Sequence, residues 1–132
     1  MTFLAKFPRF WGLAFGLLAC GHTALGSHSV PGQTEEGLAA YYSDQLHGRK
    51  TASGEPYDKN RLTGAHRELP FGTIVRVINL KNRQMVDIRI TDLGPFADHQ
   101  RIIDLSRMAA KRIGMIRDGV VPVRLEIVSM PK

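Results

Sequence analysis

Regular alternation of apolar and polar side chains most limits what this chain can fold into. Apolar residues occupy every second position of 86–90 and again of 121–127. A period of two indicates strands that bury one face and leave the other in water. Residues 73–79 are rich in β-branched side chains, and the polar turn 81–83 joins them to 85–91, which predicts a hairpin with Asn82 in the left-handed conformation.

A single short helix is expected near residues 105–113. Leu105, Met108, Ala109 and Ile113 fall on one helical face there, and Gly114 is suited to end the helix. A first strand is expected within 38–43. About six short strands and one helix in a domain of this size favour a small β-barrel over a sandwich.

The first 26 residues have the pattern of an export signal. Lys6 and Arg9 precede an apolar run, 10–19, which is too short for a mature membrane span but typical of a signal-peptide core. The alternative is a buried N-terminal helix, but the run has two glycines and no polar face. Export predicts a location in the bacterial cell envelope.

The end of this signal has two interpretations. Residues 17–20, Leu-Leu-Ala-Cys, resemble a bacterial lipobox, which would place a lipid on Cys20 and anchor the protein to a membrane. Cleavage after Gly26 would instead release a soluble periplasmic or secreted protein. Cys20 is the only cysteine, so no intramolecular disulfide can form, and its position favours lipidation.

Residues 27–36 are predicted to be a flexible tether and residues 37–132 a monomeric folded domain. Removing residues 1–26 takes away two basic residues and no acidic one, so 16 basic and 12 acidic residues remain and the net charge is +4. This excess suits an anionic cell-wall polymer or a membrane surface. Nucleic acid is not an expected partner, because no basic cluster is interleaved with aromatic residues.

Asp92 interrupts the strand pattern. It follows Val86, Ile88 and Ile90 on the face predicted to be buried, immediately before the turn expected at Gly94–Pro95. A carboxyl group where an aliphatic side chain is expected is a candidate for chemistry. The alternative is that Asp92 only caps the turn.

Other candidate groups lie in the irregular segment 47–73. Glu55 and Asp58 flank Pro56, and His66 follows on a short turn. Together with a carboxyl at a strand end, these groups suit acid–base work on a glycosidic bond or another acid-labile linkage. The alternatives are that the two carboxylates are solvated turn residues and that His66 is a core histidine bonded to a backbone carbonyl.

Metal and cofactor chemistry is not expected from this sequence. Its five histidines have no ligand spacing, and the one cysteine lies at the end of the signal. A nucleophile-elbow motif for serine–histidine chemistry is also missing from the sequence.

Four stretches resemble, in order and spacing, the rare lipoprotein A (RlpA) family of bacterial cell-envelope proteins. They are GLAAYYSDQLHGRKTASGEPYD, GAHRELPFGTIVRVINLKN, ITDLGPF and RIIDLSRMAAKRIG. The resemblance covers Gly37 to about Val128. It implies a six-stranded double-psi β-barrel and a cofactor-free lytic transglycosylase, which cleaves peptidoglycan between N-acetylmuramic acid and N-acetylglucosamine and leaves 1,6-anhydro ends.

The same resemblance implies roles for particular residues. The family's catalytic acidic and histidine positions fall on Glu55, Asp58, His66 and Asp92. The aromatic residues expected to contact the glycan are Tyr41, Tyr42, Tyr57 and Phe96. This chain departs from the family where Leu93 replaces an arginine beside Asp92, which removes a potential substrate contact.

That departure supports an alternative function, a glycan-binding wall lipoprotein without turnover, similar to the expansins that share this type of barrel. Such a protein would keep the groove, the aromatic residues and the positive charge.

Overall fold

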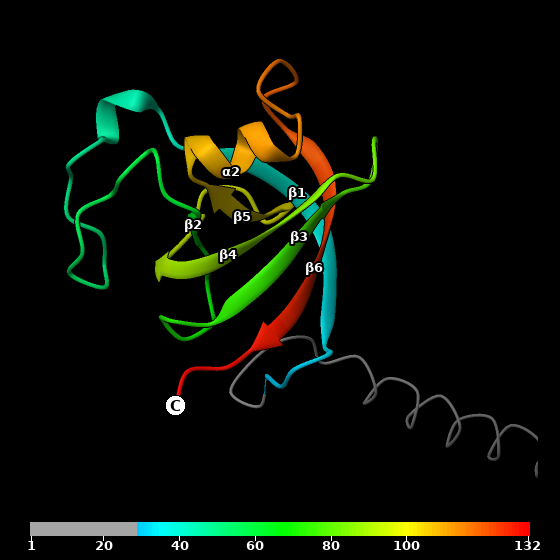
Figure 1. Ribbon diagram of the computed structural model, residues 1–132, viewed down its shortest axis with the longest axis horizontal. Helices are drawn as coiled ribbons and strands as arrows, with labels where there is room; N and C mark the ends of the chain where they lie inside the picture. Colours follow the sequence, from blue (N-terminus) through cyan, green and yellow to red (C-terminus); the bar gives the residue numbers. More distant parts are fainter. Residues whose placement is uncertain (1–28) are drawn as a thin grey trace, which may run out of the picture.

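Residues 29–132 are described by the computed structural model, and they form a closed barrel of six strands (Figure 1). The strands are β1 (Thr34–Tyr41), β2 (Thr63–Ala65), β3 (Ile74–Asn79), β4 (Met85–Asp92), β5 (Arg101–Leu105) and β6 (Val121–Ser129). They run around the barrel in the order β1-β5-β2-β4-β3-β6, and β6 pairs with β1 to close it. The pairs β1–β5 and β2–β4 are parallel and the others antiparallel, so the prediction of a six-stranded barrel is confirmed.

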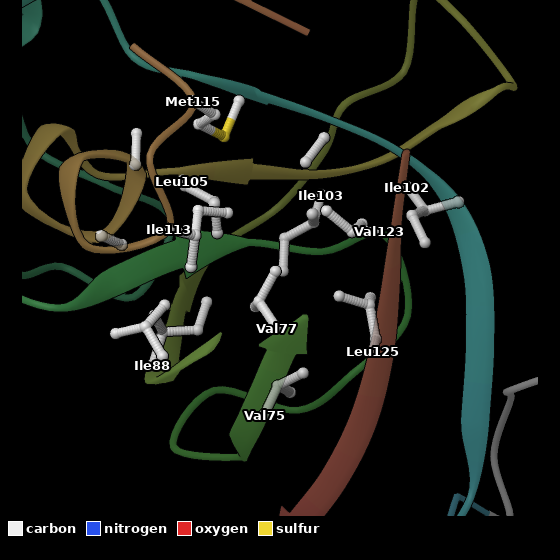
Figure 2. Packing of buried hydrophobic residues seen from close by; sticks show 14 of the residues in the cluster. Val75, Val77, Ile88, Ile102, Ile103, Leu105, Ile113, Met115, Val123 and Leu125 are labelled. Atoms are coloured by element: carbon white, nitrogen blue, oxygen red, sulfur yellow. The ribbon is translucent and has the colours of Figure 1, made fainter. Parts of the chain in front are cut away.

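The alternating strands supply the core, as predicted. In the β3–β4 hairpin, Val75 pairs with Ile88 and Val77 with Val86, and these side chains point into the barrel. Figure 2 shows Val75, Val77 and Ile88 in one cluster with Leu125 of β6 and Ile103 of β5. Full burial of each aliphatic side chain contributes about 1.5–3 kcal/mol, so this cluster accounts for the barrel's cohesion.

The turn of the hairpin differs from its prediction in one residue. Arg83, not Asn82, takes the left-handed conformation, with a φ of 67°. Asn82 instead uses its side chain: Oδ1 accepts from the Gln84 N–H at 2.9 Å and Nδ2 donates to the Ile113 carbonyl at 3.0 Å. The side-chain bonds therefore tie the turn to the segment that ends the helix.

The predicted helix is confirmed but shorter, as α2 (Arg107–Arg112). Leu105 belongs to β5, where it pairs with Gly64 of β2, and the Ser106 hydroxyl caps the helix by accepting from the Ala109 N–H at 3.2 Å. Gly114 takes a positive φ of 67° just after the helix, as predicted. A short 3-10 helix, η2 (Asp44–Leu46), precedes the irregular segment that leads to β2.

The folded domain begins earlier than the predicted boundary at Gly37. Residues 34–36, expected in the tether, pair with Glu126, Leu125 and Arg124 as the start of β1. Their side chains are polar and show no alternation that would predict a strand. They join the sheet because their backbone pairs with that of β6. The predictions for the signal, Cys20 and cleavage after Gly26 lie outside the described residues. Within 29–132, no helix is long and apolar enough to cross a membrane.

Candidate active site

Asp92 is the last residue of β4, where the pairing with β2 slips by one residue. Gly64 pairs with Ile90 and Ala65 with Asp92, so Thr91 is an extra residue in the ladder. Thr91 is buried at 5% exposure, whereas Asp92 is half-buried. The prediction that Asp92 continues the buried face is therefore wrong, because the bulge gives that place to Thr91 and re-aims the carboxyl group.

Three donors hold the Asp92 carboxylate. The Tyr42 hydroxyl donates to Oδ2 at 2.6 Å, and the Ala52 and Leu93 N–H groups each donate to Oδ1 at 2.9 Å. Burial raises the pKa of Tyr42, and the bond to Asp92 raises it further, so this hydroxyl stays a donor. The end of β1, the irregular segment and the residue after β4 thus converge on one carboxyl group.

Tyr42 is supported in turn by Tyr57. The two ring centroids lie 4.6 Å apart with planes tilted by 56°. Tyr57 is only 4% exposed, and its hydroxyl accepts from the Arg107 N–H at 3.0 Å. Tyr57 is therefore too buried for the predicted contact with a sugar. Its ring instead packs against the Tyr42 ring and supports it.

The other two predicted glycan contacts differ in exposure. Tyr41 is half-buried, and its hydroxyl donates to the Ile116 carbonyl at 2.8 Å. Phe96 is 66% exposed on the loop after β4. Of the four predicted aromatic residues, Phe96 is the one with a ring largely open to solvent.

Glu55 and Asp58 line one pocket of about 280 Å³, together with Arg61 and Thr91. We call this the acidic pocket, because two carboxylates there face one guanidinium. Asp92 does not line it, but its neighbour Thr91 does. The structure thus brings Glu55 and Asp58 together and places Asp92 one residue from their pocket.

Arg89 fixes the state of Glu55. The Arg89 guanidinium donates to both Glu55 carboxylate oxygens, at 2.8 and 2.9 Å. This bidentate bond holds the pKa of Glu55 below its ordinary value, although the pair is largely exposed. Glu55 is therefore an ionised group at neutral pH. Asp58 forms a longer ion pair with Arg61, in which 3.7 Å separate Asp58 Oδ2 and Arg61 Nε.

The His66 ring does not share a proton with Asp92. Its Nδ1 accepts from the Glu68 and Leu69 N–H groups at 3.0 and 3.1 Å, which leaves the proton on Nε2 to be donated to Glu35 at 3.0 Å. Only the backbone joins His66 to Asp92, through an N–H to carbonyl bond of 3.1 Å. The alternative of a core histidine fits better, with a Glu35 carboxylate in place of the backbone carbonyl.

Asp104 is a neighbour of the site that the sequence reasoning missed. Ala65 of β2 pairs with Asp92 on one side and with Asp104 of β5 on the other. Burial raises the pKa of Asp104, and the Arg101 guanidinium at 2.9 Å offsets part of this rise. The signal was available, since Asp104 follows two isoleucines just as Asp92 ends an apolar strand. Within residues 29–132, no three histidine, cysteine or acidic side chains are grouped to hold a metal ion.

Comparison with known proteins identifies close relatives. Residues 34–125 match the family described as lytic transglycolase. The endolytic peptidoglycan transglycosylase RlpA of Campylobacter jejuni is 50% identical over 97 residues, which are 74% of this chain and 35% of that protein. The probable endolytic peptidoglycan transglycosylase RlpA of Synechocystis is 53% identical over 92 residues, covering 70% of this chain and 28% of that protein. The chain thus spans about a third of the length of these relatives.

Solved structures show the same barrel. The Streptomyces papain inhibitor matches with a TM-score of 0.59 and 25% identity, over 74% of this chain and 96% of that one. An expansin of Clavibacter michiganensis matches with a TM-score of 0.58 and 23% identity, over 76% of this chain and 52% of that one. The mixed six-stranded barrel, the family match over most of the folded domain and relatives at about half identity lead to one conclusion: this chain belongs to the RlpA-like family of double-psi β-barrels.

Proposed function

We propose that this protein is a lytic transglycosylase that cleaves peptidoglycan strands between N-acetylmuramic acid and N-acetylglucosamine. The observation that carries the proposal is the Asp92 carboxyl group, fixed by Tyr42 and Ala52 one residue from the acidic pocket. The relatives named as peptidoglycan transglycosylases support the substrate class.

Asp92 serves as both acid and base. In its protonated form it donates to the glycosidic oxygen as the bond to C1 of the muramic-acid residue breaks. In its ionised form, it then takes the proton of that sugar's own 6-hydroxyl, whose oxygen closes on C1. The product carries a 1,6-anhydro end, no water is consumed, and Asp92 returns to its starting state.

The acidic pocket stabilises the positive charge that develops on the sugar ring. Because Arg89 keeps Glu55 ionised, Glu55 acts as a fixed negative charge and not as a proton donor. Asp58, in the same pocket, adds a second carboxylate. His66 has a positioning role, since its backbone N–H holds the end of β4 at the Asp92 carbonyl.

A second candidate is a glycan-binding protein without turnover, similar in role to an expansin. Two observations favour it. Leu93, in the place of the family's arginine, directs an exposed apolar side chain outward, and Arg89 already neutralises Glu55.

Product analysis decides between these functions. The purified protein is incubated with isolated glycan strands, and the strands are examined by mass spectrometry. Release of anhydro ends is the expected result. New reducing ends would mean a hydrolase, and strands that are bound but uncut would mean the glycan-binding protein; either result contradicts the proposal.

Export and lipid anchoring on Cys20 complete the proposed function, in line with the cell-wall substrate of the relatives. Metabolic labelling with a fatty acid should tag the wild-type protein and not the Cys20→Ala variant. A mature protein that begins at Ser27 and carries no label would contradict the anchor.

A further inference from the structure

A second pocket, of about 430 Å³, is lined mainly by cationic side chains. Lys59, Arg107 and Lys111 line it, with Asp44 as the one carboxylate. We call it the basic pocket. Met108 and Ile116 also line it, so the pocket is partly apolar.

The cations of this pocket are available to a ligand. Within residues 29–132, the Lys59 and Lys111 ammonium groups have no hydrogen-bond or ion-pair partner. Arg107 contacts Asp44 only at 3.5 Å, and its guanidinium lies 5.9 Å from the Tyr41 ring centroid. One carboxylate thus offsets only part of the charge of three cations, and the pocket attracts anions.

The two pockets lie on either side of one short segment, 58–61. Asp58 and Arg61 line the acidic pocket, whereas Lys59 and Asn60 line the basic one. The backbone of Lys59 is fixed, because its N–H donates to His47 Nδ1 at 3.1 Å and its carbonyl accepts from the Met108 N–H at 2.9 Å. A ligand that extends across this segment can therefore occupy both pockets at once, one on each side of the segment.

Muramoyl residues match this pair of pockets in charge. A peptidoglycan strand carries its anionic groups on N-acetylmuramic acid, whose lactyl group ends in a carboxyl, while N-acetylglucosamine is neutral. In the acidic pocket, Arg89 and Arg61 already pair with the two carboxylates, so a carboxylate of the substrate finds no free cation there. The basic pocket offers the Lys59 and Lys111 ammonium groups, which are unpaired within the described part of the chain, so it suits the carboxylate, and this difference would also set the direction in which a strand lies.

We infer that the basic pocket binds a carboxylate borne by a muramoyl residue while a neighbouring sugar occupies the acidic pocket. The inference rests on the proposed glycan substrate. The carboxylate has two sources, the free lactyl group of a strand without peptides or the peptide of a substituted strand.

The test compares the Lys59→Gln/Lys111→Gln double variant with an Arg83→Gln/Lys132→Gln double variant. The control removes two exposed cations that lie outside the basic pocket, so the net charges of the two variants are equal. Dissociation constants are measured for three ligands: peptide-bearing strands, peptide-free strands with intact lactyl carboxylates, and peptide-free strands with these groups reduced to alcohols. Circular dichroism checks that both variants are folded.

We expect the pocket variant to bind the carboxylate-bearing strands about 5-fold more weakly, since exposed ion pairs are each worth under about 1 kcal/mol. On reduced strands it should bind as the wild type does, and the control should change little on either. Loss confined to peptide-bearing strands would assign the carboxylate to the peptide. Equal losses in pocket variant and control, or losses that persist on reduced strands, would overturn the inference.

Cleavage is scored separately from binding. If the wild type binds with the expected carboxylate dependence but releases no anhydro ends, the transglycosylase proposal fails and the basic pocket stands. If it releases anhydro ends while the pocket variant binds all strands as the wild type does, the basic pocket fails and the transglycosylase stands.

Discussion

Asp92 and His66 are joined by a backbone hydrogen bond, yet their side chains serve different regions of the molecule. The Asp92 carboxylate is held by donors from three segments, stays half-exposed and lies next to the acidic pocket. The His66 ring is 2% exposed, and every polar atom of it is bonded within the protein. Residues from two motifs of the same family resemblance can therefore end in different environments, one open to a ligand and one closed within the protein.

The largest expected effect on cleavage is that of Asp92→Asn. The amide keeps the size of the side chain and can still accept from the Ala52 or Leu93 N–H, but it cannot transfer a proton. Release of anhydro ends should fall by on the order of 10²-fold or more. The melting temperature should change little. A variant that cleaves at the wild-type rate would remove Asp92 from the mechanism and leave Glu55 as the next candidate.

The opposite result is expected for His66→Ala. Loss of the ring leaves the Glu68 and Leu69 N–H groups without their acceptor and opens a cavity beside Glu35. The free energy of unfolding should fall by about 2–3 kcal/mol, measured by urea denaturation. His47→Ala is the control, because the His47 ring is exposed and accepts from one N–H. If the folded His66→Ala protein is as stable as the wild type but inactive, His66 belongs to the chemistry.

Tyr42→Phe probes how tightly the carboxylate must be held. Removing the 2.6 Å bond frees one oxygen of Asp92 while the ring still packs on Tyr57. We expect the cleavage rate to fall by about 10-fold, since mispositioned catalytic groups lose part of their effect. Tyr41→Phe is the matched control, because it removes a hydroxyl that bonds only to the Ile116 carbonyl. Equal rate losses in both variants would point to the packing of β1 and not to Asp92.

The sequence predicted what depends on local pattern and missed what depends on register and distance. Alternation was enough for the β3–β4 hairpin and β6, because a strand with one buried face must carry that period. The bulge that turns Thr91 inward could not be predicted, because the alternation of apolar and polar residues in β4 continues up to Asp92 without interruption. The bonds of Glu35 to His66 and of Arg89 to Glu55 join residues more than 30 positions apart, and only the closed barrel brings them together.

The smallest effect is expected for Asp104→Asn. This variant tests whether burial of the Asp104 carboxylate, next to Asp92 across β2, lowers the stability of the fold. Because burial raises the pKa of Asp104 above its ordinary 3.8, folding favours the protonated form. The stability from this preference is present below pH 3.8 and is lost as the pH rises through the higher value in the folded protein. The amide has no such loss. The variant should therefore gain stability relative to the wild type as the pH rises above 3.8, by under about 1 kcal/mol, since Arg101 offsets part of the burial. Thermal melts across this range measure the difference, with the exposed Asp118→Asn as control. A stability difference that stays constant or falls with rising pH would show that the Arg101 guanidinium fully compensates the burial of the Asp104 carboxylate.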